Sequence, residues 1–526
     1  MQKKNHNMRT EKKSSIKNSA TRLILIALLV LIQTGWMIFL MSKLNTYSTA
    51  ITLTLTCIAV LIALKVFGTH VNSAQRMPWL IVITAVPFFG ICIYLLFGRS
   101  IVTKGMRRRF NGIEADILEN KLSQDEKIID ELDKKDRGIA NQCRYISNTA
   151  KYPVYKNTDM EYYPNALESF EAQLEELSKA EKFIFMEYHA IEDAISFAKL
   201  KKVLIDKAKS GVEVRIFYDD LGSIFFLNKE FIKRMRKEGI QCRVFNPLKV
   251  IVNMFMNNRD HRKITVIDGK VGFTGGYNLA DEYFNITHPY GYWKDTGVKI
   301  KGDAVKSLTA SFLTMWNAID HTDSQEDYDK YIDATDGTYA AVSKECYVQP
   351  YSDNPLGHDR IGEDVYLNIL KNAKDYVYIT TPYLIITDEM ERELRLAVKR
   401  GVDVRIVTPG IPDKKLVYKI TRSYYEPLCS AGVRIYEYTP GFCHAKQWVS
   451  DDEVSVVGTI NMDFRSLYLH FENAVFTYNK ELAAKVKEDM LNDFNVSREV
   501  TADYAVDVIR PLKLGTCMLH MISPLL

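Results

Sequence analysis

The sequence predicts an α/β protein of two similar lobes, each a mixed sheet flanked by helices, preceded by an N-terminal transmembrane helical region. Three observations lead to this prediction. A motif built on histidine and lysine occurs twice, at His261 and at His444. The segments around it repeat with a period of about 190 residues, which fits a duplicated lobe and is too long for a solenoid. The first hundred residues contain three uncharged apolar runs, whereas the remainder has the composition of a soluble protein.

The apolar runs lie within residues 22–99, after a basic tail at residues 1–21. A helix needs about 20 residues to cross a hydrocarbon core of about 30 Å, and each run is long enough. The first run is longer than the apolar part of a signal peptide and has no A-x-A-like cleavage site, so we do not expect its removal. The second run contains several threonines, which leaves an interfacial position open. The candidate helices are residues 23–41, 46–64 and 78–98.

Two clusters of basic residues flank the apolar runs and restrict the topology. One lies in the N-terminal tail, and the other extends from Arg99 to Arg109. Basic residues beside membrane helices favour the cytoplasmic side, yet three complete crossings would separate the two clusters. Either one segment does not cross or one cluster lies outside, and Pro87 and Gly90 interrupt the third run without deciding between these alternatives. We expect a multi-pass protein whose catalytic part is cytoplasmic.

Composition excludes some classes of function. The formal net charge is only +4 and no basic stripe is interleaved with aromatic residues, so we expect no nucleic-acid partner. The basic residues gather around the apolar runs, which indicates contact with anionic membrane lipid. Eight scattered cysteines form no CxxC pair, so neither a disulfide framework nor a zinc site is expected. We expect no cofactor and no metal.

The rest of the chain divides into a charged helical connector at residues 100–149 and two lobes, at residues 150–325 and 326–526. Each lobe contains an apolar strand, an amphipathic helix that ends at a glycine, and a second strand. The glycine and the start of the second strand are Gly211–Ile216 in one lobe and Gly401–Ile406 in the other. This order predicts βαβ units in a parallel or mixed sheet. Two lobes related by a pseudo-dyad would bring one histidine from each into a single site.

Each copy of the motif has the spacing H-x-K-x4-D-x6-G-[GT]-x-N. Strand alternation places the histidine and the lysine on one face, so two lobes present two imidazoles and two ammoniums. This set suits a phosphodiester: one histidine attacks phosphorus and becomes a phosphohistidine, the other protonates the leaving alcohol, and the ammoniums stabilise negative charge. The aspartate fits a hydrogen-bonding role that orients the motif. The copies comprise His261, Lys263, Asp268, Gly275, Gly276 and Asn278, and His444, Lys446, Asp451, Gly458, Thr459 and Asn461.

At these residues the chain resembles the phospholipase D superfamily, and segments around them resemble the bacterial cardiolipin synthases. The resembling segments are residues 219–223, 275–283, 292–300, 458–466 and 523–526. The resemblance implies two phospholipase D-like lobes in an enzyme of the bacterial cell membrane that needs no cofactor. It also implies the reaction, in which a phosphatidyl group passes from one phosphatidylglycerol to another and gives cardiolipin and glycerol.

The resemblance further implies the site residues. The catalytic set would be His261, Lys263, Asp268, His444, Lys446 and Asp451, and the substrate-binding support would be Asn278, Asn461, Arg465 and Glu472. The superfamily usually attacks with its first motif, which makes His261 the nucleophile and His444 the general acid, although the sequence itself is symmetric on this point.

Three alternatives stay open at the level of sequence. The first is a phospholipase D or another phosphatidyltransferase with a different acceptor. The second is a non-catalytic lipid-binding scaffold, against which the two intact motifs argue. The third concerns the apolar residues 251–256, which either contact lipid or form an ordinary buried element.

Overall fold

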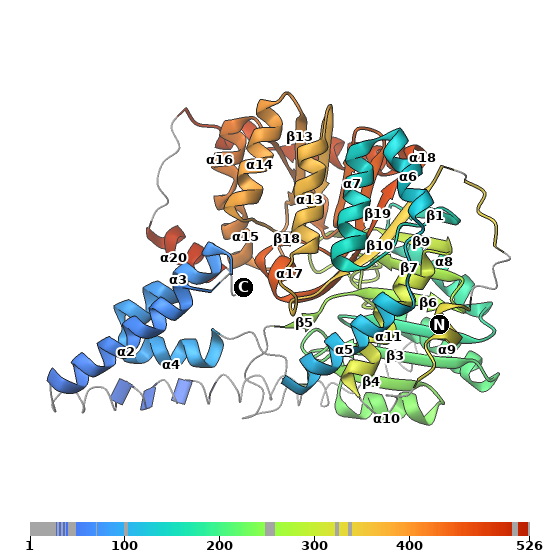
Figure 1. Cartoon of the computed structure of the whole chain (residues 1–526), viewed down its shortest axis with the longest axis horizontal. Coiled ribbons are helices and arrows are strands. Elements are labelled where there is room, and N and C mark those ends of the chain that lie inside the picture. Colours follow the sequence, from blue (N-terminus) through green and yellow to red (C-terminus); the bar gives the residue numbers. More distant parts are fainter. Residues whose placement is uncertain are drawn as a thin grey trace.

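A computed structural model describes most of the chain, and Figure 1 shows its elements. The described residues are 49–69, 71–98, 104–247, 258–320, 326–334, 339–343, 345–507 and 514–523, together with seven positions between 28 and 39. The candidate helix at residues 23–41 therefore lies largely outside the described residues, and the apolar segment at residues 251–256 lies outside them altogether.

The part of the chain that follows residue 150 alternates strands and helices. The first lobe contains strands β1 (Thr158–Tyr163), β2 (Phe183–Tyr188), β3 (Glu213–Asp219), β4 (Gln241–Phe245), β5 (Arg259–Asp260), β6 (Lys263–Ile267), β7 (Val271–Gly275), β8 (Tyr292–Lys294) and β9 (Gly297–Gly302), and helices α8 (Ala166–Ser178), α9 (Ile195–Lys209), α10 (Lys229–Lys237) and α11 (Val305–Ile319). A short helix α12 (Asp329–Ile332) follows.

The second lobe repeats this order. Its strands are β10 (Tyr347–Asp353), β11 (Tyr376–Thr380), β12 (Leu384–Ile385), β13 (Asp403–Pro409), β14 (Arg434–Tyr438), β15 (Gly441–Cys443), β16 (Gln447–Ser450), β17 (Val454–Gly458), β18 (Met462–Asp463), β19 (His470–Tyr478) and β20 (Ser497–Glu499). Its helices are α13 (Ile361–Asn372), α14 (Asp388–Lys399), α15 (Lys415–Ser423), α16 (Tyr425–Ala431), α17 (Phe464–Tyr468), α18 (Lys480–Asn495), α19 (Thr501–Tyr504) and α20 (Leu514–Ile522).

The two main sheets have matching strand orders. The first is β1-β9-β7-β6-β2-β3-β4, and the second is β10-β19-β17-β16-β11-β13-β14-β20. In both, the strands joined through helices pair in parallel, as β2 with β3 and β11 with β13 do, and the remaining pairs are antiparallel. The central strands β2 and β11 are buried along their whole length, because helices cover both faces of a mixed sheet. The expected fold of two similar α/β lobes is confirmed.

Two equivalent helices hold the lobes together. Helix α11 follows β9, buries almost its entire surface, and contacts both the first sheet and β10 of the second. Helix α18 follows β19 and covers the second sheet while also contacting β1 of the first. One hydrophobic core therefore runs through both lobes and includes Phe185, Trp316 and Val456. This shared core fixes the histidine of each lobe relative to the other.

One short strand crosses from each lobe into the other, and these two strands position the motif histidines. Strand β5 of the first lobe pairs in parallel with the start of β19 in the second lobe. Strand β15 of the second lobe pairs in parallel with β8 of the first lobe. Each crossing strand ends immediately before a motif histidine, so the exchange is reciprocal.

The charged segment expected as a connector is helical and packs closely on both lobes. It forms α5 (Lys104–Asn120), α6 (Glu126–Lys135), α7 (Arg137–Tyr145) and the single π-turn η2 (Ile146–Ala150). Helix α5 lies along α11, with Phe110 and Ile117 fully buried, while α7 lies beside α13 of the second lobe (Figure 1). Apolar positions at helical spacing within a charged sequence account for this packing.

In the described residues from 49 to 98, three helices precede the connector, and they modify the expected membrane region. They are α2 (Thr49–Phe67), α3 (Ser73–Ala85) and α4 (Pro87–Phe97). The single helix expected over residues 78–98 is wrong, because the chain breaks at Val86, whose backbone is not helical. Pro87 lacks the amide hydrogen that would continue the helix, and its ring clashes with the preceding turn, so it begins α4 instead.

The break produces a tight helical pair. A side chain at Gly90 would approach the carbonyl oxygen of Val82 to 2.3 Å, so only glycine permits α4 to lie this close to α3. Asn72, just before α3, donates hydrogen bonds to Tyr468 and Glu389 of the second lobe. Across the described residues, no helix combines the length and the apolar composition that a membrane crossing requires.

Candidate active site

The two motif histidines are held in the same way by opposite lobes. The amide of His261 donates to the carbonyl oxygen of Phe471 at 2.9 Å, and the amide of His444 donates to that of Lys294 at 2.7 Å. Each contact extends a crossing strand pair by one residue. The backbone of each histidine is therefore fixed by the lobe that does not contain it.

The histidine side chains are also paired across the lobes. Nδ1 of His261 lies 2.9 Å from both carboxylate oxygens of Glu472, and Nδ1 of His444 lies 2.6 Å from Oδ2 of Asp295. Both carboxylates are fully buried, and the two histidines are 7% and 6% exposed. A carboxylate at Nδ1 holds the proton there and leaves Nε2 with a free lone pair. This arrangement prepares each ring for attack or proton transfer through Nε2.

The motif position that is glycine in the first lobe and threonine in the second, Gly276 and Thr459, contacts the carboxylate of its own lobe. The hydroxyl of Thr459 donates to Glu472 and accepts from the backbone amide of Asn473, which holds the Glu472 carboxylate against its histidine. At Gly276, a Cβ atom would lie 2.0 Å from Oδ1 of Asp295, so the shorter aspartate leaves no space for a side chain. The second lobe thus combines the longer acid, Glu472, with threonine, and the first lobe combines the shorter acid, Asp295, with glycine.

The motif lysines lie beside the histidines. Nζ of Lys263 donates to the carbonyl oxygen of His261 at 2.6 Å. Nζ of Lys446 lies 2.8 Å from Nδ1 of His444 and donates to that residue's carbonyl oxygen. Burial lowers the pKa of Lys263 to about 7 and that of Lys446 to about 8. A bound phosphodiester anion would restore their positive charge, which suits a site that receives a phosphate.

The electrostatics of the two histidines differ. Burial, assisted by Lys263 and His189, lowers the pKa of His261 well below its usual value. Burial and Lys446 lower the pKa of His444 to about 4, while Asp295 opposes the decrease. Both rings are therefore neutral in the free site at pH 7, and the Asp295 carboxylate favours a proton on His444.

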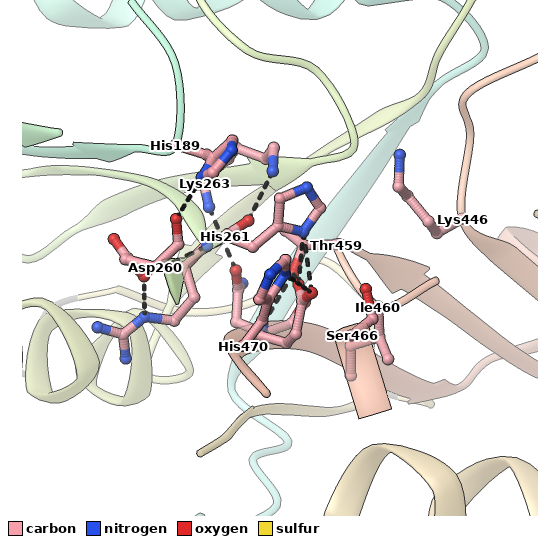
Figure 2. A network of polar contacts seen from close by, with 12 residues as sticks. His189, Asp260, His261, Lys263, Lys446, Thr459, Ile460, Ser466 and His470 are labelled. Carbon is pink, nitrogen blue, oxygen red and sulfur yellow. Dashed lines mark hydrogen bonds and ion pairs between the residues drawn. The ribbon is translucent and has the colours of Figure 1, made fainter. Parts of the chain in front are cut away.

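Both histidines open into one cavity of about 460 Å³ between the lobes. Its wall combines polar groups with apolar side chains that include Ile385, Val417 and Phe464. Figure 2 shows His261 near its centre, with His189 and His470 beside it and Lys446 across from it. The mixed lining suits a ligand that has a charged headgroup next to an apolar portion.

Three of the expected binding residues, one asparagine from each motif and an arginine, also line this cavity. The amide of Asn278 accepts from the backbone of Ala190 and donates to Tyr283, so it supports the protein itself. The side-chain oxygen of Asn461 is buried without a hydrogen-bond partner and is available to a ligand. Arg465 faces the cavity, and burial lowers the pKa of its guanidinium, which favours an anionic ligand there.

The structure does not bring Asp268 and Asp451 to this cavity, and each makes its hydrogen bonds at the turn that follows its motif strand. Both occupy left-handed turns, with φ of 52° and 54°. The carboxylate of Asp268 accepts three backbone hydrogen bonds, from residues 181–183 at the start of β2. Asp451 does the same for residues 374–376 at the start of β11. Each lies at the far end of a motif strand, about 3.3 Å per residue away from its histidine.

We predict that Asp268→Ala lowers the free energy of unfolding by on the order of 3 kcal/mol, because three amide groups at the edge of the sheet lose a charged acceptor. The turnover of the folded fraction should change by less than about twofold. Thermal unfolding in detergent and turnover per folded molecule measure the two effects, and Asp130→Ala, at an exposed helical aspartate, is the matched control. Loss of turnover with unchanged stability would contradict the structural role.

A second prediction concerns pH. His444 has a pKa of about 4 in the folded protein, against 6.5 for an unperturbed histidine. Between these values the unfolded chain binds a proton that the folded protein does not, so stability rises with pH over this window. We expect acidification from pH 6.5 to 4 to remove up to about 3 kcal/mol through this residue. Thermal unfolding across this range should show a shallower dependence for His444→Gln than for the wild type; equal slopes would be inconsistent with the buried neutral ring.

Sequence reasoning missed Asp295, His189 and His470. Asp295 corresponds to Glu472 because the two lie near the starts of equivalent strands. Asp295 lies just before β9, and Glu472 lies near the start of β19. The equivalence is hidden because Asp295 lies 17 residues after Asn278, whereas Glu472 lies 11 after Asn461. The longer loop in the first lobe removes the regular spacing. No local pattern indicates His189 or His470, which reach the site only through folding.

Comparisons with known proteins match this architecture. A family model described as cardiolipin synthase, phospholipase D-like domain, matches residues 174–316 and 366–494, and one described as phospholipase D-nuclease N-terminal matches residues 53–99. An uncharacterized protein of Streptococcus mutans is 40% identical over 465 residues, covering 88% of this chain and 99% of its own. A cardiolipin synthase of Clostridium perfringens is 33% identical over 464 residues, covering 86% and 95%. A crystal structure of phosphatidylserine synthase from Haemophilus influenzae shares the fold, with a TM-score of 0.53 and 13% identity, over 73% of this chain and 98% of the other.

Proposed function

The chain belongs to the cardiolipin synthase family of phospholipase D-like proteins, and we propose on this premise that it joins two phosphatidylglycerol molecules into cardiolipin and glycerol. The protein is a phosphatidyltransferase. The observation that carries the reaction is the crossed pairing, in which each motif histidine meets a buried carboxylate of the other lobe above one cavity. Two equivalent rings on one cavity can exchange the roles of nucleophile and acid.

In the first half of the reaction, binding of the phosphodiester anion first protonates His444 on Nε2. Nε2 of His261 then attacks the phosphorus of one phosphatidylglycerol. A phosphorus–nitrogen bond forms, and the bond to the headgroup glycerol oxygen breaks. His444 gives its Nε2 proton to that oxygen, so glycerol leaves as a neutral alcohol and His444 becomes neutral. The ammoniums of Lys263 and Lys446 stabilise the negative charge on the phosphoryl oxygens.

In the second half, the roles reverse. The terminal hydroxyl of a second phosphatidylglycerol gives its proton to neutral His444 and attacks the same phosphorus. The phosphorus–nitrogen bond breaks, and its electron pair returns to His261. The products are cardiolipin and the original enzyme, with no net change in protons.

The difference between the two histidines supports this assignment of roles. A nucleophile must be unprotonated, and burial together with the charge of Lys263 lowers the pKa of His261. A general acid must bind a proton, and Asp295 opposes the decrease of the pKa at His444. A phosphodiester anion between the rings raises both pKa values, and the Asp295 carboxylate stabilises the proton on His444.

We also propose that the protein is embedded in the cell membrane, with its catalytic part in the cytoplasm. The candidate helices 23–41 and 46–64 would cross, whereas α3 and α4 would enter and leave on one side. Their lengths, about 20 Å and 16 Å, are shorter than a hydrocarbon core of about 30 Å. Figure 1 shows α3 leading away from the lobes and α4 turning back. Two crossings and one re-entrant pair would place both basic clusters on the cytoplasmic side, where the positive-inside rule expects basic residues.

The test uses the purified chain in liposomes of phosphatidylglycerol alone, without added metal or nucleotide. We expect cardiolipin and glycerol in equal amounts. Phosphatidic acid without cardiolipin would instead identify a hydrolase, in which water takes the place of the second lipid. If the folded protein formed neither cardiolipin nor phosphatidic acid, the proposal would be refuted.

A further inference from the structure

A cluster of imidazoles surrounds the proposed nucleophile. The ring centres of His189 and His470 lie 5.0 Å and 5.4 Å from that of His261, and all three rings line the same cavity (Figure 2). His189 has a defined partner, because its Nδ1 lies 2.6 Å from the carbonyl oxygen of Asp260. The proposed reaction uses neither His189 nor His470.

His470 is the unexplained member of this cluster. The residue is 92% buried, yet among the described residues neither ring nitrogen has a hydrogen-bond partner, and the ion-pair contact of its Nδ1 with Oε1 of Glu472 is 3.6 Å long. A buried polar ring without partners is costly, and such groups in folded proteins usually have a protein, water or ion partner. The position of this ring, facing Glu472 and the cavity, indicates an exchangeable partner there.

The atoms around that position have the character of metal ligands. Among the residues that the structure describes, His261, His470 and Glu472 form one group whose ligand atoms all lie within 4.8 Å of one another. Two imidazoles and one glutamate are a ligand set that zinc takes in proteins, with its fourth position left to water or substrate. Here the fourth position would face the cavity.

We propose that His261, His470 and Glu472 form a zinc site, and that a zinc ion bound there reversibly inhibits the enzyme by occupying its nucleophile. The ion would enter between His261 and Glu472 and replace the hydrogen bond that they now share. His470 would supply the third ligand and gain the partner that it lacks.

The inhibition follows from the tautomer of His261. A neutral imidazole carries one proton, which the Glu472 carboxylate now holds on Nδ1. A zinc ion on Nδ1 moves this proton to Nε2, so the atom that attacks phosphorus loses its lone pair. A zinc ion on Nε2 would occupy the lone pair directly. Either mode of binding stops the first half of the reaction, and no proton is gained or lost by the site as a whole.

Neighbouring cations set the strength of binding. Lys263 is next to the nucleophile and Arg465 faces the same cavity, so a divalent ion enters against positive charge. We therefore infer an exchangeable inhibitory ion rather than a resident cofactor. A chelator should remove it and restore turnover.

The first experiment measures binding alone. The metal-free full chain in detergent is titrated with zinc chloride in competition with a fluorescent chelator. We expect one equivalent to bind, with affinity reduced roughly 100-fold in His470→Gln and unchanged in His358→Gln, at an exposed histidine. His470→Asn, a smaller polar replacement, repeats the test if the glutamine variant unfolds at lower temperature. No binding by the wild type, or equal binding by wild type and both His470 variants, would overturn the proposal.

The second experiment measures inhibition, and this part rests on the proposed function. Each protein's turnover of phosphatidylglycerol is compared with and without zinc, relative to its own metal-free rate. We expect zinc to inhibit the wild type and His358→Gln, a chelator to reverse this, and His470→Gln to lose the sensitivity. Zinc binding without inhibition of an active enzyme would disprove the inhibitory role. Zinc binding by a protein with no turnover would refute the proposed function and leave the metal site standing.

Discussion

The His261→Asn protein is expected to lose cardiolipin formation by roughly 10⁴- to 10⁶-fold, because the imidazole that forms the covalent intermediate is removed. The turnover of phosphatidylglycerol by His444→Asn should be similarly slow, because the glycerol oxygen of the lipid cannot leave without a proton. Product formation in phosphatidylglycerol liposomes measures both losses. His358→Asn, at an exposed loop position, is the control and should be fully active.

A change of leaving group separates the two roles. A phosphatidyl ester of p-nitrophenol releases a stable phenolate and needs no acid. With this substrate His444→Asn should still release about one equivalent of p-nitrophenol in a rapid burst, whereas His261→Asn should release none. A burst from His261→Asn and none from His444→Asn would reverse the assignment. Retained turnover of phosphatidylglycerol in either variant would exclude a shared two-histidine site.

The second large effect is expected at the crossed carboxylates. Asp295→Asn and Glu472→Gln preserve shape but remove the charge that holds the Nδ1 proton of His444 and His261. We expect turnover to fall by two to four orders of magnitude in each, with little change in the Michaelis constant, because the neutral amide favours the wrong tautomer and does not stabilise the imidazolium. The folded fraction should remain close to that of the wild type. Steady-state kinetics in mixed micelles test this expectation.

Double variants show whether each carboxylate acts through its assigned ring. Combining Asp295→Asn with His444→Asn should be no slower than His444→Asn alone, because the carboxylate then has no ring to position. Combining Asp295→Asn with His261→Asn tests a carboxylate and a histidine that do not contact each other. If Asp295→Asn instead slowed every histidine variant by the same factor, its role would not depend on His444.

Several features followed from local sequence because they depend on residues close together in the chain. Helix–glycine–strand repeats indicated βαβ units, and the repeated spacing around His261 and His444 indicated two equivalent lobes. The break at Pro87 was visible as a proline, but whether α3 and α4 would separate there depended on how closely Gly90 and Val82 could approach. Spacing alone does not show whether the carboxylate of Asp268 faces the site or the start of a neighbouring strand, and the structure places it at the start of β2.

The sequence by itself determined that this protein has two copies of a histidine–lysine motif, and it predicted that they serve one phosphoryl-transfer site. Only the tertiary structure decided which carboxylate contacts which histidine, and that His470 lies beside His261 and Glu472. The reason is separation along the chain. His261 meets Glu472 across 211 residues and His444 meets Asp295 across 149, and these distances are closed by strands that cross between the lobes. Such contacts depend on the packing of both sheets around one core, which no local pattern records.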